Sequence, residues 1–205
     1  MHLFHRPTSR LFSITAWLVF LALLVSFNAY AGKKERLGLI TGIGSQGNIL
    51  LHNALFYRYD VALIHLNYSV CIVERKQLAL FLLTEPQFNF ARFRDKDIPQ
   101  FKPAFEFGTS FGFQLQQQLK NDKWKGYLGL QSGPHFISDS PLRQVPGFII
   151  ANHAYFGSLY HLSNHLSLDL RLGVRHMSNA GLEEPNGGIN TFVFMVGLAY
   201  THKPD

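Results

Sequence analysis

A histidine and a serine stand two residues apart near the end of the chain, at His176 and Ser178. An imidazole beside an alcohol can take the hydroxyl proton, and this converts a poor nucleophile into an effective one. Successive side chains of a β-strand point to opposite faces, so residues two apart share a face. On a strand, these residue types and this spacing predict nucleophilic attack on a carbonyl group. The H-x-S spacing alone is a weak signal, because it occurs often by chance.

The residues that follow could supply other parts of such a site. Backbone or amide N–H groups stabilise the oxyanion that forms during acyl transfer. Asn179 and the amides around Gly181 are candidates for this oxyanion site, because they come directly after the serine. A third group normally orients the imidazole and supports its positive form.

The start of the chain indicates export. Residues 1–31 have a basic beginning, an apolar run over 11–27 and small residues at Ala29 and Ala31, which is the pattern of a secretory signal peptide. We expect cleavage after Ala31, which leaves the mature part 32–205 as one barrel domain. The alternative is an uncleaved membrane helix, since the apolar run is close to the ~20 residues that span a bilayer.

Composition is consistent with an exported membrane protein. The 205 residues include 19 Phe, and only 16% are charged. The formal net charge of +6 favours anionic partners such as phosphorylated lipid or nucleic acid. Cys71 is the single cysteine, so an intramolecular disulfide is excluded. A closed barrel stabilises such a chain by pairing every strand edge.

Segments with alternating apolar and polar residues recur after residue 31, separated by turn residues. This pattern is typical of a transmembrane β-barrel. In the segment 103–116, large apolar residues such as Phe105 and Phe107 alternate with Glu106, Gly108 and other small or polar residues. A soluble sandwich gives the same alternation, but the signal peptide and the large apolar side chains favour an all-β, eight-stranded antiparallel outer-membrane barrel. The eight expected strands are 36–44, 57–68, 78–91, 103–116, 123–136, 147–160, 165–178 and 190–200.

Strand order fixes the expected orientation. Both termini of outer-membrane barrels lie in the periplasm, so every odd strand ends at the cell exterior. The connections expected outside are 45–56, 92–102, 137–146 and 179–189. The connection 69–77 is long for a periplasmic turn, so either the second strand extends further or this boundary is wrong.

Parity within the expected strand 165–178 places the candidate pair. His176 and Ser178 continue the even-numbered stripe of Leu166, Leu168, Leu170, Leu172 and Val174, which we expect to face lipid. The pair then lies on the outer wall, at the level of the outer leaflet, where the acyl esters of lipopolysaccharide lie. The alternative is that both are ordinary polar residues at the headgroup boundary.

The segment 175–181 (RHMSNAG), followed by 185–189 (PNGGI), resembles the C-terminal motif of the lipid A deacylase family (PagL-type, also classed as acyloxyacyl hydrolases). The likeness extends back through 147–157. It implies an outer-membrane serine hydrolase that removes the ester-linked acyl chain at the 3-position of lipid A, with no metal or organic cofactor. By the motif, His176 matches the base, Ser178 the nucleophile, and Asn179 with the Gly181 region the oxyanion site.

The sequence departs from the family at the third group. The family has an acid shortly after the P-N-x-G-I segment, and here that position is Asn190. An asparagine can orient an imidazole but brings no charge to support its positive form. Glu183 or Glu184 could substitute, although both also fit solvated loop charges. The chain is therefore expected to be a slow enzyme or one that has lost the activity.

Several further expectations remain open. Basic residues of the external connections could hold lipid phosphates or could simply be solvated: Arg92, Arg94, Lys96, Lys102 and Arg143. The histidines outside the motif show no metal-ligand spacing, and no nucleic-acid motif is present. The expected partners are lipopolysaccharide and the outer membrane, while a homodimer is left open. The competing functions are a structural or lipid-binding barrel and, less favoured because side chains fill a narrow lumen, a small channel.

Overall fold

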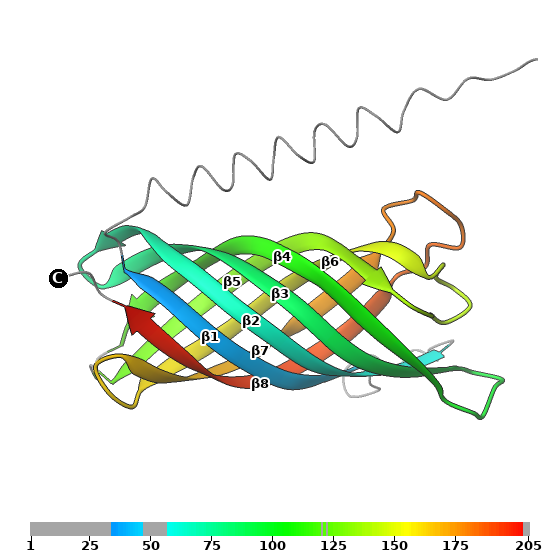
Figure 1. Cartoon of the computed structure of the whole chain (residues 1–205), viewed down its shortest axis with the longest axis horizontal. Helices are drawn as coiled ribbons and strands as arrows, with labels where there is room; N and C mark the ends of the chain where they lie inside the picture. The colour runs from blue at the N-terminus through cyan, green and yellow to red at the C-terminus, as the bar shows by residue number, and fades with distance from the viewer. Residues whose placement is uncertain (1–33, 47–56, 120, 122, 203–205) are drawn as a thin grey trace, which may run out of the picture. The chain divides into compact units, whose positions relative to one another are not determined.

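The computed structural model describes residues 34–46, 57–119, 121 and 123–202. Within this part, antiparallel strands pair in chain order and β8 closes the ring on β1 (Figure 1). The expected eight-stranded barrel is confirmed. No helix among the described residues is long and apolar enough to cross a membrane. The strands are β1 (Glu35–Ser45), β2 (Tyr57–Arg75), β3 (Leu78–Asp95), β4 (Lys102–Gln118), β5 (Trp124–Ile137), β6 (Gly147–His161), β7 (Leu166–Ser178) and β8 (Ile189–His202).

Most strands are longer than the sequence pattern predicts, most of all β2. This strand continues to Arg75, so the long connection expected over 69–77 reduces to a tight turn at Lys76 and Gln77. The pairing register between β2 and β3 shifts between Cys71 and Val73. Such a bulge adds a residue to one strand and breaks its alternation, which is why the end of β2 does not look like a strand in the sequence. The expected signal peptide 1–31 and most of the connection 45–56 lie outside the described residues.

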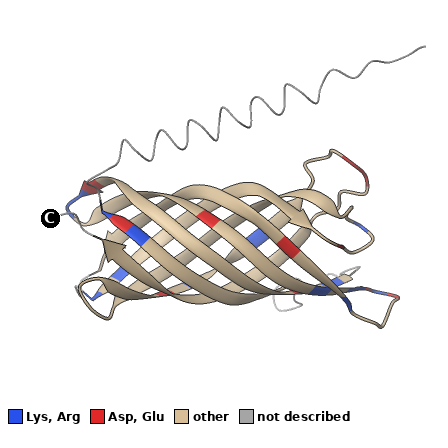
Figure 2. Cartoon of the chain, in the orientation of Figure 1, with Lys and Arg blue, Asp and Glu red and all other residues tan. Residues whose placement is uncertain are grey.

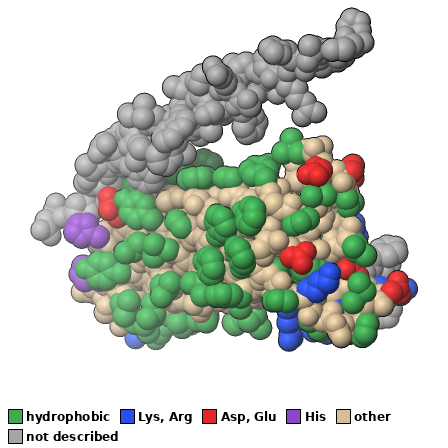
Figure 3. All heavy atoms as spheres, turned by 45° about the vertical axis from the view of Figure 1, so that its right-hand side comes forward, with side chains coloured by type: hydrophobic (Ala, Val, Ile, Leu, Met, Phe, Trp, Pro, Cys, Tyr) green, Lys and Arg blue, Asp and Glu red, His purple; other side chains and the backbone are tan. Residues whose placement is uncertain are grey.

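The alternation places large apolar side chains on the outer wall and polar ones inside. On β4, Phe105, Phe107 and Phe113 are exposed, while Glu106 and Gln114 are fully buried. Apolar side chains cover the barrel wall in the face that Figure 3 shows. The outward stripe expected from sequence parity is therefore confirmed on this strand.

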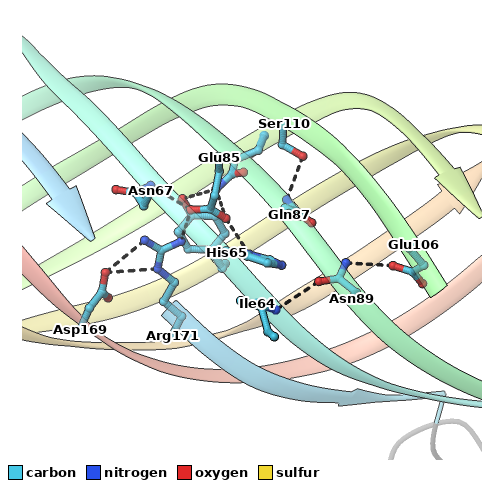
Figure 4. A network of polar contacts seen from close by, with 12 residues as sticks. Ile64, His65, Asn67, Glu85, Gln87, Asn89, Glu106, Ser110, Asp169 and Arg171 are labelled. Carbon is cyan, nitrogen blue, oxygen red and sulfur yellow. Dashed lines mark hydrogen bonds and ion pairs between the residues drawn. The ribbon is translucent and has the colours of Figure 1, made fainter. Parts of the chain in front are cut away.

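Figure 2 marks charged positions along the barrel strands, and several of the charged side chains that point into the lumen form ion pairs (Figure 4). The Arg171 guanidinium lies 2.7 Å from the Glu85 carboxylate and 3.1 Å from that of Asp169. Arg175 forms a second buried ion pair with Glu106. Breaking a buried pair by removing one partner is strongly destabilising. The Arg171–Glu85 and Arg175–Glu106 pairs therefore hold β7 to β3 and β4 across the barrel. Their fully buried side chains occupy the lumen, which argues against a channel.

Candidate active site

His176 lies near the C-terminal end of β7, where its exposed side chain faces Asn190 of β8 across the strand pair. The His176 Nδ1 atom is 2.7 Å from the Asn190 Oδ1 atom. If the amide oxygen accepts this hydrogen bond, Nδ1 carries the proton and Nε2 is free to accept another. Asn190, which the resemblance places at the position of the acid, is therefore the residue that touches the imidazole.

Ser178 ends β7 on the same outward face and is partly exposed. Its register partner on β6 is Ile150, while that of His176 is Asn152. In the described part of the chain, the Ser178 hydroxyl makes no hydrogen bond to the imidazole. Catalytic hydrogen bonds are often long in a structure without substrate and tighten when substrate binds. The position of His176 and Ser178 on the same face of β7 is therefore what brings the two side chains together.

The loop after β7 is held together by Asn179. Its backbone N–H donates to the Asn186 side-chain oxygen at 3.0 Å, and its amide nitrogen donates to the Glu183 carbonyl at 2.6 Å. Its own side-chain oxygen accepts from the Gly181 N–H at 3.0 Å. Both oxyanion candidates therefore use their backbone N–H groups inside the loop in this structure.

Gly188 forms the other wall beside the imidazole. A Cβ atom at this position would lie 2.8 Å from the His176 Cε1 atom, and the backbone φ is +68°. The Gly188 N–H donates to the Gln144 side-chain oxygen at 3.1 Å, and its carbonyl accepts from the Tyr57 hydroxyl at 3.0 Å. Glycine is needed here for two reasons, because a side chain would both strain the backbone and push the imidazole away.

The alternative acids are placed elsewhere. The Glu184 carboxylate accepts a hydrogen bond from the Asn186 N–H at 2.9 Å. Glu183 accepts a hydrogen bond from the Asn179 side chain at its backbone carbonyl. Neither carboxylate is a partner of His176 among the described residues. The sequence left these two residues open as substitutes for Asn190, and the geometry brings only Asn190 to the imidazole.

Two polar residues that the sequence motif did not include extend the site. Ser132 of β5 and Asn152 of β6 are exposed on the outer wall, and the Ser132 hydroxyl donates to the Asn152 side-chain oxygen at 2.8 Å. Ser132, Asn152, His176 and Asn190 are direct register partners on adjacent strands. We call these four residues the polar row. Strand parity makes Ser132 continue the outward stripe of Leu128 and Leu130, so the sequence could have placed it on the outer wall, but not in register with Asn152 and His176.

An apolar groove lies directly below the polar row. Leu130, Ala154, Val174 and Phe192 are register partners on the same four strands, one step further from the loop that follows β7. Together with Phe113 and the polar row they line a groove of about 710 Å³. The small side chain of Ala154 stands between two larger neighbours and so leaves space on the wall. The groove therefore joins a hydrocarbon surface to a polar end at His176.

The basic residues considered for phosphate binding separate into two groups. Arg143 donates to the Gly187 carbonyl and accepts the Gly187 N–H at its own backbone oxygen, so it supports the loop beside the site. Arg92 and Arg94 lie on the outer wall at the C-terminal end of β3, and Lys96 follows in the next connection. In the described part of the chain, no group of three or more His, Cys, Asp or Glu residues could hold a metal ion.

Comparison with known proteins places the chain in a family. The family model of lipid A 3-O-deacylase (PagL) matches residues 66–199. The crystal structure of the outer membrane enzyme PagL superposes with a TM-score of 0.54 and 15% identity, over 79% of this chain and 97% of that one. OprG from Pseudomonas aeruginosa gives a TM-score of 0.47 and 11% identity, over 85% of this chain and 97% of that one.

Neisserial surface protein A gives a TM-score of 0.44 and 12% identity, over 82% of this chain and 96% of that one. No curated protein shows significant sequence similarity to the chain. The likeness to the PagL crystal structure supports the fold, and the family model covers more than half of the chain. The protein therefore belongs to the PagL family of lipid A 3-O-deacylases.

Proposed function

We propose that the protein is an outer-membrane serine esterase that removes the ester-linked acyl chain from the 3-position of lipid A. The observation that carries this proposal is the His176–Asn190 contact, which lies beside Ser178 at the polar end of an apolar groove on the lipid-facing wall. Family membership supports the same substrate class. A lipid can reach this groove from the membrane without leaving it.

In the proposed reaction, the groove holds the acyl chain and the ester lies at the level of His176 and Ser178. The Ser178 hydroxyl attacks the acyl carbonyl and transfers its proton to the His176 Nε2 atom. The tetrahedral intermediate then collapses, and the imidazolium returns the proton to the departing sugar oxygen. Water, activated by the same imidazole, attacks the acyl-serine ester and releases the fatty acid.

Asn190 is the reason we propose a slow enzyme. A carboxylate can only accept a hydrogen bond, so it fixes the proton on the His176 Nδ1 atom. An amide can also turn its NH₂ group toward the His176 Nδ1 atom and donate to it. The neutral ring then carries its proton on Nε2, and Nε2 cannot accept the proton of the Ser178 hydroxyl. Replacing the carboxylate by an amide in a Ser-His-Asp enzyme lowers turnover by about 10⁴.

We assign the oxyanion site to Asn179 and Gly181 by the family motif. Their N–H groups are engaged within the loop, so at least one must exchange its partner when the acyl carbonyl arrives. Asn152 is a further donor, because its side-chain oxygen is occupied by Ser132 and its NH₂ group remains to donate. Asn152 stands diagonally across from Ser178 in the register, a separation that longer side chains can bridge.

Mass spectrometry of lipid A tests the proposal. Cells that express the wild-type protein should accumulate lipid A that lacks one acyl chain, and cells that express Ser178→Ala should not. Ser158→Ala is the matched control, since Ser158 lies on β6 outside the groove. Equal acyl loss from the wild type and Ser178→Ala would rule out the serine mechanism.

The second candidate function is a structural or lipid-binding barrel that has lost the chemistry. Asn190 is the observation that favours it, because the imidazole then has no carboxylate partner. Under this alternative, wild-type protein leaves lipid A unchanged while Asn190→Glu gains activity.

A further inference from the structure

Three arginines gather on the outer wall at the external end of β2 and β3. The Arg58 Nε atom lies 3.1 Å from the Asp60 carboxylate, and the Arg92 Nε atom lies 3.3 Å from the same group. The guanidinium carbons of Arg58, Arg92 and Arg94 lie 5.9, 4.9 and 5.1 Å from the centre of the Phe101 ring. We call Arg58, Arg92 and Arg94 the arginine cluster. Figure 3 shows basic side chains, with acidic ones beside them, at this end of the barrel.

The charges of the arginine cluster are not balanced. Among the described residues, Asp60 is the carboxylate that forms ion pairs with the arginine cluster, and it pairs with both Arg58 and Arg92. Asp95 is buried on the inner side, where it accepts the Leu142 N–H at 3.1 Å. Like charges held around one ring repel one another, so an anion bound among them would relieve this repulsion.

The arginine cluster is also accessible and oriented. The side chains of Arg58 and Arg92 are 52% and 63% exposed, while that of Asp60 is 17% exposed. Asp60 also accepts a hydrogen bond from the Ser45 hydroxyl at 2.6 Å, which ties it to β1. Asp60 thus anchors two guanidinium groups to the wall and leaves their outer N–H groups for a ligand. Guanidinium groups match the geometry of phosphate oxygens.

A second groove connects the arginine cluster to the active site. It has a volume of about 920 Å³ and begins at Arg58, Asp60 and Arg92. It continues over apolar side chains of β8 and β7 to Phe192 and Val174, which also line the groove below His176. A lipid with several acyl chains could therefore occupy both grooves at once, with its polar head along the rim.

We propose that Arg58, Arg92 and Arg94 bind a phosphate group on the headgroup of the lipid whose acyl chains occupy these grooves. The identity of that lipid as a phosphorylated lipid A rests on the proposed function. The phosphate would fix the headgroup at β2 and β3, so that an ester beyond β1 and β8 meets His176 and Ser178 on β7. The neutralised cluster would hold its three guanidinium groups together without net repulsion.

Binding can be measured without turnover. The Ser178→Ala protein is placed in lipid nanodiscs that contain either bis-phosphorylated lipid A or the same lipid A without phosphates, and retained lipid is counted by native mass spectrometry. The background variant is then combined with Arg58→Gln, Arg92→Gln and Arg94→Gln. Arg75→Gln with Lys76→Gln is the matched control at the other end of β2. Heat-dependent gel migration reports that each barrel has folded.

The Ser178→Ala background should prefer the phosphorylated lipid, and the triple arginine variant should lose about tenfold or more of that preference, which corresponds to one charge-assisted hydrogen bond. The control variant should keep it. An unchanged preference in the triple variant overturns the proposal. Complete displacement of the lipid by inorganic phosphate also overturns it, because the cluster would then be a free-anion site. Acyl loss in wild-type cells is a separate measurement, so the binding site and the esterase can fail independently.

Discussion

Two parts of the outer wall face the membrane with opposite chemistry. On β3, β4 and β5, Phe88, Phe105, Phe107 and Phe136 form a continuous aromatic surface with ring centres 5.2 to 6.4 Å apart. On β5 to β8, the outer wall instead carries the polar row and the groove below it. Hydrocarbon favours the first arrangement and penalises the second.

This difference indicates which part of the outer wall has a function other than contact with lipid. The aromatic surface follows from the bilayer alone, since large apolar side chains on the outward positions are sufficient for it. A row of four polar side chains in direct register has no such explanation, and its hydrogen bonds are arranged in two pairs, Ser132 with Asn152 and His176 with Asn190. The following predictions compare substitutions on the two surfaces.

The largest effect is expected for His176→Ala. Removal of the base should lower the rate of acyl release by about 10²–10⁴, the usual contribution of general acid–base catalysis. The exposed position predicts little change in the stability of the barrel. Phe107→Ala on the aromatic surface is the comparison variant, and its rate in the same vesicle assay should match the wild type. Equal rates for His176→Ala and the wild type would show that the polar row takes no part in catalysis.

A gain of activity is expected for Asn190→Glu. A carboxylate at this position fixes the proton on the His176 Nδ1 atom and supports the imidazolium, so the rate should rise by about 10²-fold or more. Asn190→Gln keeps the amide on a side chain of the same length as glutamate and should give no such rise. A comparable gain for both variants would show that side-chain length, rather than charge, limits the reaction.

A smaller and selective effect is expected for Ala154→Phe. The phenyl group would fill the space between Leu130 and Val174, which are the register partners of Ala154. Release of long acyl chains should slow by about tenfold, because burial of each CH₂ group contributes about 0.8 kcal/mol. Release of short acyl chains from matched esters should change less. Equal slowing for all chain lengths would place the acyl chain outside this groove.

The sequence predicts the barrel well and the site in part. Period-two alternation identifies each strand, and the motif identifies His176, Ser178 and Asn190 because they are close along the chain. The polar row extends to Ser132 and Asn152 only through pairing between strands, and a single strand's pattern does not contain that register. The engagement of Asn179 inside its own loop is likewise a property of the folded backbone, which the motif cannot reveal.

The smallest effect tests whether the polar row lies in hydrocarbon at all. If it does, Asn152→Leu should stabilise the barrel by about 1 kcal/mol, because a polar amide no longer faces lipid. The reverse exchange on the aromatic surface, Phe107→Asn, should destabilise it by about 1–3 kcal/mol. Urea unfolding in lipid vesicles measures both. If Asn152→Leu is neutral while Phe107→Asn is costly, the polar row lies at the headgroup level. The active site would then meet the ester from above the hydrocarbon rather than within it.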